Sequence, residues 1–169
     1  MLILENPDVV LVHGDTSTTF VTAPTEMARQ NLIDEKRDEN SIYVTGNTAI
    51  DALKTTVKEN YTHPELEWAS GSRLIMITAH RRENLGEPMH NMFRAIRRII
   101  DENPDVKAIY PIHMNPRVRE AAEQELGRCS RIRVIEPLDV LDFHNFLARS
   151  YLIITDSGGI QEEAPSLGK

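Results

Sequence analysis

The chain has 169 residues, a net charge of −7 and 40% hydrophobic residues, which is typical of a soluble globular protein. This length suits one domain, or one domain with part of another. The acidic balance argues against a nucleic-acid-binding surface. Cys129 is the only cysteine, which excludes an intrachain disulfide and a cysteine-based metal cluster and makes the reducing cytoplasm the expected compartment.

The sequence shows no targeting or membrane segment. No apolar run approaches the roughly 20 residues that a membrane-spanning helix needs, so we expect no membrane association. The first ten residues, MLILENPDVV, have neither the basic start nor the apolar stretch of a signal peptide. Both ends interrupt what reads as a continuing element, so we expect a fragment of a longer protein.

Short apolar runs alternate with longer amphipathic ones along the chain. Strands are predicted at residues 9–12, 41–45, 74–78, 107–112, 132–135 and 152–155. Helices are predicted at residues 26–34, 48–59, 89–102, 117–126, 140–149 and 158–164, with Thr25 as the N-cap of the first, and residues 61–72 are predicted to be a linker. From residue 74 onward the regular strand–helix alternation predicts an α/β fold with a parallel sheet covered by helices.

In such a sheet, ligands bind beyond the carboxyl ends of the strands, so the residues after each strand form the candidate site. Ser157, Gly158 and Gly159 follow the last strand, where small residues let backbone N–H groups approach an anion at the start of a helix. Glu162 and Glu163 come next, and a carboxylate there can accept hydrogen bonds from ribose hydroxyls. The combination indicates a nucleotide diphosphate site, and the alternative is a tight turn followed by ordinary helix-start acids.

The densest charged cluster, HRREN at residues 80–84, directly follows the buried strand at 74–78. Its two arginines beside His80 suit recognition of a phosphate or a carboxylate, and His80 could donate a proton or bind phosphate. The alternative is a solvated loop. His113 also follows a strand, with a weaker case for function, and Asp15 is either a general base or the cap of a turn.

Other classes of site are disfavoured by the sequence. The Walker A motif and the G-x-G-x-x-G motif are both absent. The HGD of residues 13–15 and the later Gly46-Asn47 are similar to elements of two-metal phosphoesterases. However, Thr48 stands where those enzymes need a histidine, and no Asp-x-His comes earlier, so no metal site is predicted.

Six stretches in a fixed order carry a family resemblance. They are HGDTSTT, APTEMARQNL, YVTGNTAIDAL, TAHRREN, YPIHMNP and TDSGGIQEEAPSLGK. Together they strongly resemble the non-hydrolysing bacterial UDP-N-acetylglucosamine 2-epimerases over nearly the whole chain. The last stretch is long and specific to that family.

The resemblance implies a glycosyltransferase-B-type fold, in which two Rossmann-like domains enclose the site between them. It implies interconversion of UDP-N-acetylglucosamine and UDP-N-acetylmannosamine, by elimination of UDP to 2-acetamidoglucal and re-addition to the other face. It also implies that no nicotinamide or metal cofactor is needed, that the intact family member is a homodimer, and that the product feeds cell-surface polysaccharide synthesis.

The resemblance assigns roles to residues of this chain. Asp15 matches the aspartate of the HGDT turn, a candidate catalytic acid/base, and His80 is the second candidate catalytic residue. His80 and Arg81 match the HRRE element that contacts phosphates. Arg81 and His113 also match positions that line an allosteric UDP-N-acetylglucosamine site in some members.

The contacts to UDP are assigned in the same way. Ser157, Gly158 and Glu163 match the element that holds the diphosphate and the ribose. Phe143 falls where the family places its uracil contact. UDP or UDP-N-acetylglucosamine is therefore the expected ligand.

The sequence departs from the family pattern after Phe20. In the family, a block with two glutamates implicated in epimerisation separates HGDTxTT from APTE, and here APTE follows almost at once. We expect residues 1–22 to be a remnant of the first domain, 23–72 the inter-domain connection, and 73–169 the second, UDP-binding domain, truncated at its C-terminal end. The chain as given is predicted to be inactive; the alternatives are a UDP-sugar glycosyltransferase of the same fold and a non-catalytic UDP-binding remnant.

Overall fold

The structure is a computed structural model that describes residues 21–169. The predicted strand at 9–12 and the predicted catalytic residue Asp15 lie outside the described residues. The chain divides into two compact units, residues 1–51 and 52–169. This division falls inside the segment that the sequence predicts to connect two domains. Within the described part, no helix combines the length and the apolar character that crossing a membrane requires.

The first unit contains a pair of short parallel strands. Its elements are β1 (Val21–Ala23), α2 (Glu26–Asp34), the short 3₁₀ helix η1 (Glu39–Ser41) and β2 (Ile42–Val44). The strands β1 and β2 pair in parallel. The Thr25 side chain accepts a hydrogen bond from the backbone N–H of Ala28 (3.1 Å), which confirms the predicted N-cap. The sequence does not reveal β1, because three residues are too few to show a period.

The segment that follows differs from its prediction in two ways. α3 (Thr48–Thr56) ends before residue 59, because the backbone N–H of Lys58 donates to the Asn145 side chain (2.9 Å) instead of continuing the helix. The prediction of a linker at residues 61–72 is wrong, because this segment contains the helix α4 (Pro64–Ala69). The His63 side chain caps this helix, and proline suits its first position, where a backbone N–H has no helical partner.

The second unit confirms the predicted Rossmann-like α/β fold. Its strands are β3 (Arg73–Thr78), β4 (Val106–Pro111), β5 (Ile132–Ile135) and β6 (Leu152–Thr155). Its other helices are η2 (Arg82–Asn84), α5 (Glu87–Glu102), α6 (Pro116–Leu126), α7 (Val140–Arg149) and α8 (Gly158–Ser166). All strand pairs are parallel, and the order is β5-β4-β3-β6. The chain therefore reverses its direction of winding between β3 and β6, which is where open α/β sheets bind ligands.

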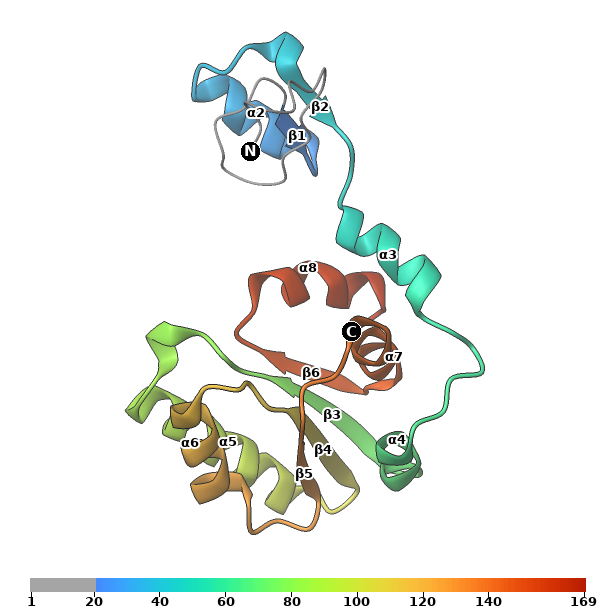
Figure 1. The fold of residues 1–169 in the computed structure, drawn as a ribbon, viewed down its shortest axis with the longest axis vertical. Coiled ribbons are helices and arrows are strands. Elements are labelled where there is room, and N and C mark those ends of the chain that lie inside the picture. The colour runs from blue at the N-terminus through green and yellow to red at the C-terminus, as the bar shows by residue number, and fades with distance from the viewer. Residues whose placement is uncertain (1–20) are drawn as a thin grey trace, which may run out of the picture. The chain divides into compact units, whose positions relative to one another are not determined.

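Helices cover both faces of this sheet (Figure 1). The α5 and α6 helices pack on one face, and α4, α7 and α8 supply residues to a second core on the other. Alternate residues of β3 belong to the two cores: Ile75 and Ile77 to the first, Leu74 and Met76 to the second. A strand that is apolar on both faces is what a two-sided parallel sheet requires.

The α5 helix shows how sequence spacing produces this packing. Met89, Phe93, Ile96 and Ile100 recur at intervals of three or four residues, so they share one face, and all are buried. Arginines occupy intervening positions, and two of them pair with acidic residues one turn away, as Arg97 does with Asp101 (2.8 Å).

We expect Ile96→Ala to lower the free energy of unfolding by about 2–5 kcal/mol, because the buried side chain would leave a cavity. Ile99→Ala on the same helix is the matched control. The Ile99 side chain is 38% exposed, so its loss is expected to cost at most about 1 kcal/mol. Urea denaturation monitored by circular dichroism measures the free energy of unfolding of both variants. Equal losses of this free energy would contradict the assignment of the buried face.

Candidate functional site

The candidate site lies where β3 and β6 end side by side. Thr78 and Thr155 are paired in the strand register, and the Thr78 hydroxyl donates to the Thr155 hydroxyl (2.5 Å). The Thr155 hydroxyl in turn accepts from the backbone N–H of Ser157 (2.9 Å). The two strand ends are therefore joined by side-chain hydrogen bonds just before the loops that carry the predicted site residues.

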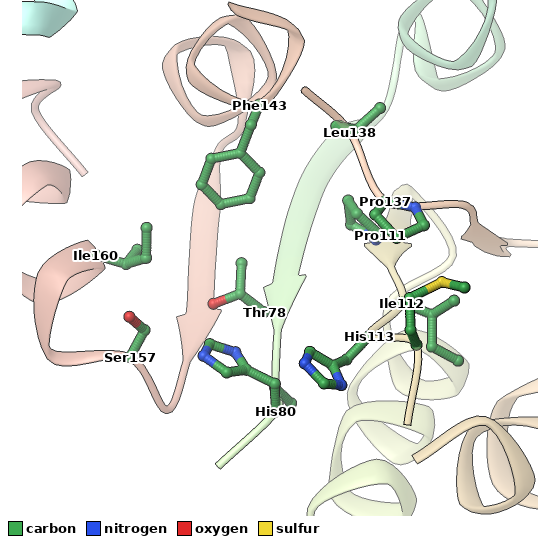
Figure 2. Close-up of a pocket in the computed structure, with 12 residues that line it drawn as sticks. Thr78, His80, Pro111, Ile112, His113, Pro137, Leu138, Phe143, Ser157 and Ile160 are labelled. Carbon is green, nitrogen blue, oxygen red and sulfur yellow. The ribbon is translucent and has the colours of Figure 1, made fainter. Parts of the chain in front are cut away.

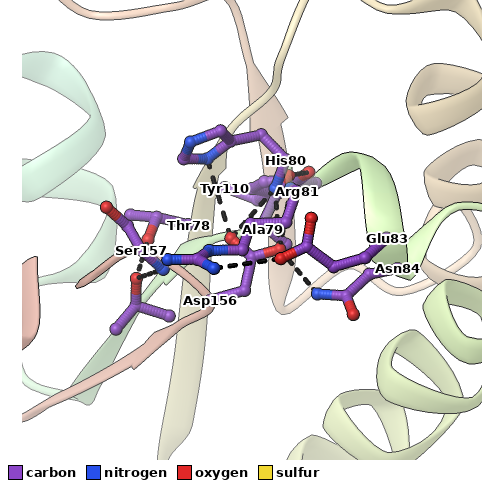
Figure 3. Close-up of polar contacts among 10 residues, drawn as sticks. Thr78, Ala79, His80, Arg81, Glu83, Asn84, Tyr110, Asp156 and Ser157 are labelled. Carbon is purple, nitrogen blue, oxygen red and sulfur yellow. Dashed lines mark hydrogen bonds and ion pairs between the residues drawn. The ribbon is translucent and has the colours of Figure 1, made fainter.

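Asp156 holds the loop after β3 in place (Figure 3). Its carboxylate accepts hydrogen bonds from the backbone N–H of His80 (3.1 Å) and of Arg81 (2.9 Å), and from the Asn84 side chain (3.0 Å). The His80 ring is also near, with Nδ1 3.7 Å from the carboxylate. One side chain after β6 thus fixes the backbone of the charged HRREN loop after β3.

The Asp156 side chain is 9% exposed, yet it is held as an anion. Burial by itself acts to raise the pKa of its carboxyl group. The hydrogen bonds from Arg81, Asn84 and His80 outweigh burial, so the pKa lies below its usual value. A charged and almost fully buried carboxylate at this point makes the geometry of the loop dependent on Asp156.

Tyr110 supports the same loop from within the core. Its side chain is fully buried, and its hydroxyl donates to the backbone carbonyl of Ala79 (2.6 Å). Burial raises the pKa of Tyr110, and the nearby negative charge of Asp156 raises it further, so the hydroxyl stays neutral and available as a donor.

The structure brings His80 and His113 together, since they follow the adjacent strands β3 and β4. Their rings are stacked, with centroids 5.8 Å apart and an interplanar angle of 14°. The Nδ1 atom of His113 accepts from the backbone N–H of Asn115 (3.1 Å), so in the neutral ring the proton is on Nε2. Two imidazoles therefore stand next to each other beside the strand ends.

The start of α8 has the features of an anion site. Ser157 is its N-cap residue but makes no side-chain capping bond, so its hydroxyl is not committed to the helix. The Arg81 side chain lies beside the start of the helix: a Cβ on Gly158 would be 3.5 Å from one of its terminal nitrogens. A helix N-terminus next to a guanidinium group suits a phosphate.

An apolar cavity of about 420 Å³ opens beside this helix start (Figure 2). Its polar end carries His80, His113 and Ser157, whereas Phe143 and Ile160 line the apolar part. Figure 2 shows the Phe143 ring lying between α7 and the end of β3. A cavity that is mostly apolar with a few polar groups at one end is typical of a small-molecule site.

Three of the predicted site residues that the structure describes, Arg81, Gly158 and Glu163, do not line this cavity. Arg81 lines a second hollow, of about 400 Å³, together with His80 and His113. Glu163 is one helical turn beyond Ile160 on α8 and is not among the residues that line either hollow; its carboxylate is 3.8 Å from the His144 ring. Both hollows share His80 and His113, so these two histidines lie at their boundary.

Sequence reasoning does not single out Asp156, Tyr110 or the two strand-end threonines. The available signal for Asp156 is its place directly after a buried strand, in front of the small residues at 157–159. Among the residues that the structure describes, no group of three or more histidine, cysteine or acidic side chains is arranged to hold a metal ion.

The comparisons with known proteins decide the family. The sequence model of the family described as UDP-N-acetylglucosamine 2-epimerase matches residues 20–169. This chain belongs to the UDP-N-acetylglucosamine 2-epimerase family. A curated family member from Bacillus subtilis (strain 168) is 49% identical over 207 residues, which cover 96% of this chain and 54% of the relative. The chain therefore spans about half the length of the curated relatives it matches.

Solved structures agree with the family assignment. S. aureus MnaA, crystallised with UDP, has a TM-score of 0.94 and 43% identity, over 99% of this chain and 58% of that one. The UDP-N-acetylglucosamine 2-epimerase of Neisseria meningitidis, bound to UDP-N-acetylglucosamine, has a TM-score of 0.81 and 37% identity. The match covers 90% of this chain and 43% of that one.

The alignment with the Bacillus subtilis protein also bears on the predicted internal deletion. It extends over 207 residues, whereas this chain has 169, so it must include positions that this chain lacks. The family model begins its match at residue 20, next to the junction where the sequence predicts the missing block.

We expect Asp156→Asn to lower the free energy of unfolding by about 1–3 kcal/mol at pH 7, because three donors would lose a charged acceptor. The folded-state pKa of Asp156 is lowered, so its stabilising contribution is complete above the unfolded carboxyl pKa of about 3.9 and is lost as the pH falls through the folded value. The variant should therefore lose less stability than the parent between about pH 5 and pH 2.

Urea denaturation across this pH range measures the effect. Glu120→Gln, on the exposed side of α6, is the control and should stay within about 0.5 kcal/mol of the parent at pH 7. Parallel acid profiles for the parent and the Asp156 variant would contradict the assigned role.

Proposed function

We propose that residues 73–169 form the UDP-binding domain of a UDP-N-acetylglucosamine 2-epimerase. The observation that carries the proposal is the start of α8, where the Arg81 guanidinium lies beside Gly158 and Ser157 caps no backbone group with its side chain. A diphosphate carries the charge that such a site favours. The UDP in the S. aureus structure and the UDP-N-acetylglucosamine in the Neisseria meningitidis structure support this choice of ligand.

The parts of the nucleotide are proposed to occupy separate surfaces. The diphosphate lies against Ser157, Gly158 and Arg81, and the uracil ring stacks on Phe143 in the apolar cavity. Glu163 accepts hydrogen bonds from the ribose hydroxyls. The cavity of about 420 Å³ is large enough for a pyrimidine base with part of its sugar.

The proposed reaction uses this site to stabilise the leaving group. A base removes the proton from C2 of the sugar, and the bond between C1 and the diphosphate oxygen breaks, which gives 2-acetamidoglucal and UDP. UDP then adds back to C1, and a proton returns to the opposite face of C2. The positive charge of Arg81 and the α8 N-terminus stabilise the departing diphosphate, with His80 and Asp15 as the proposed proton-transfer groups.

The internal gap gives this chain a different expected behaviour from an intact enzyme. The block that the sequence lacks after Phe20 includes two glutamates implicated by the family resemblance in epimerisation. We therefore propose that the chain binds UDP without catalysing epimerisation. The intact family member is proposed to be a cytoplasmic homodimer that supplies polysaccharide synthesis, and size-exclusion chromatography with light scattering would test the dimer.

The test is to complete the chain with the segments of the Bacillus subtilis relative that it does not cover, the block missing after Phe20 among them, and to compare the restored and the given protein with UDP-N-acetylglucosamine by proton NMR, without any acceptor. The restored protein should form the manno epimer, and the chain as given should not. Asp15→Asn and His80→Ala should each lower the rate of the restored protein by at least about 100-fold, the usual size of a general acid–base contribution. Turnover by the unrestored chain, or normal rates in both variants, would refute the assignment.

A control variant should separate these effects from general damage. Val140 is 59% exposed at the start of α7, so Val140→Ala should leave the rate of the restored protein unchanged.

A further inference from the structure

His144 on α7 is a buried histidine with a polar neighbour at each ring nitrogen. It is 6% exposed. Its Nδ1 atom is 2.8 Å from the Thr56 hydroxyl, and its Nε2 atom is 3.8 Å from Oε2 of Glu163. The proposed reaction uses Glu163 but assigns nothing to His144.

One oxygen of the Glu163 carboxylate lacks a hydrogen-bond donor among the described residues, and His144 is placed to be that donor. Its Oε2 atom is buried and has no hydrogen-bond partner in the described part of the chain, while the side chain as a whole keeps 12% of its surface exposed. A buried carboxylate oxygen without a donor is unfavourable. The Nε2 atom of His144 already lies within ion-pair distance, so a small side-chain movement completes a hydrogen bond.

The position of the His144 ring is fixed from the other side. Thr56 is held by Asn145, whose side chain donates to the Thr56 carbonyl (2.8 Å) and accepts from the Lys58 backbone N–H (2.9 Å). The Thr56 hydroxyl donates either to Ala52 or to the imidazole. In the first case the neutral ring donates through Nδ1 and its Nε2 carries no proton, and in the second its single proton is on Nε2. The second arrangement places an N–H toward Glu163.

We propose that His144 is a positioning residue for Glu163. Its Nε2–H donates to Oε2, which orients the carboxylate so that its second oxygen can accept from the vicinal hydroxyls of the ribose. The inference rests on the proposed function, because the ribose is part of the proposed UDP ligand. One helix, α7, then serves two parts of the nucleotide, since Phe143 contacts the base and the adjacent His144 orients the ribose ligand.

Two substitutions separate the two sides of the ring. In His144→Asn the shorter amide can still reach Thr56 from the place of Nδ1 but loses the donor toward Glu163. In His144→Gln the longer amide can place a donor near the position of Nε2 but loses the contact with Thr56. If His144 only holds Thr56 in place, His144→Gln should bind UDP more weakly than His144→Asn. If His144 positions Glu163, His144→Asn should be the weaker binder.

The readout is the affinity of the whole 169-residue chain for UDP and for 2′,3′-dideoxyuridine diphosphate, measured by calorimetry. The parent should bind UDP about tenfold more tightly than the dideoxy nucleotide, as expected for hydrogen bonds to a charged carboxylate. His144→Asn should lose this preference, with a roughly tenfold weaker affinity for UDP and an unchanged affinity for the dideoxy nucleotide. His144→Gln should keep most of the preference.

Equal weakening of both nucleotides, or an unchanged preference in His144→Asn, would overturn the positioning role. A parent chain that binds no UDP would instead overturn the proposed function. The role of His144 is then decided by ¹⁵N NMR of the imidazole at pH 7, which also serves if a variant fails to fold. We expect Nε2 to carry a proton and its ¹⁵N signal to shift in Glu163→Gln. An unprotonated Nε2 would overturn the inference.

Discussion

The buried carboxylate of Asp156 is the interaction on which the candidate site depends. It connects the ends of β3 and β6, which are adjacent in the sheet but far apart in sequence. Its bonds to the backbone of His80 and Arg81 set the path of the charged loop, and they are strong because the carboxylate remains ionised although it is 9% exposed. Without this anion, the backbone N–H groups of His80 and Arg81 and the Asn84 side chain would lose their shared acceptor.

The sheet order explains why the site forms at this place. After β5 the chain crosses to the opposite side of β3, so the helices that follow β3 and β6 pack on different faces of the sheet. The loops at their starts must separate, and the space between them opens beside Phe143 and Ile160. Apolar walls come from the second core, and the polar end comes from the strand termini. The site is thus a consequence of the topology, and its specificity comes from a few side chains.

The sequence predicts the architecture well because strand and helix periods are local signals. The β3–α5–β4–α6–β5–α7–β6–α8 succession is confirmed, including the Thr25 cap in the first unit. The α4 helix is missed, since its six residues depend on a His63 cap that propensity does not reveal. Asp156 is missed for another reason: its importance comes from donors more than 70 residues away, and no local pattern encodes them.

The structure places the predicted site residues in different surroundings. His80, His113, Ser157 and Phe143 line one cavity, although the family resemblance assigns His113 to an allosteric site with Arg81 and not to the UDP site. The Glu163 carboxylate lies 3.8 Å from the His144 ring, a contact between two helices that sequence spacing does not predict. Asp15 lies outside the described residues, so its proposed catalytic role depends on activity measurements alone.

The central claim is that the start of α8 and the loop after β3 bind the diphosphate of UDP. Amide NMR during a titration with UDP tests it most directly, with uridine as the control that lacks phosphate. UDP should shift the amide signals of Gly158, Gly159 and residues 80–84 together, and uridine should leave those signals unchanged. Shifts confined to other parts of the folded chain, or equal shifts with uridine, would contradict diphosphate binding at this site.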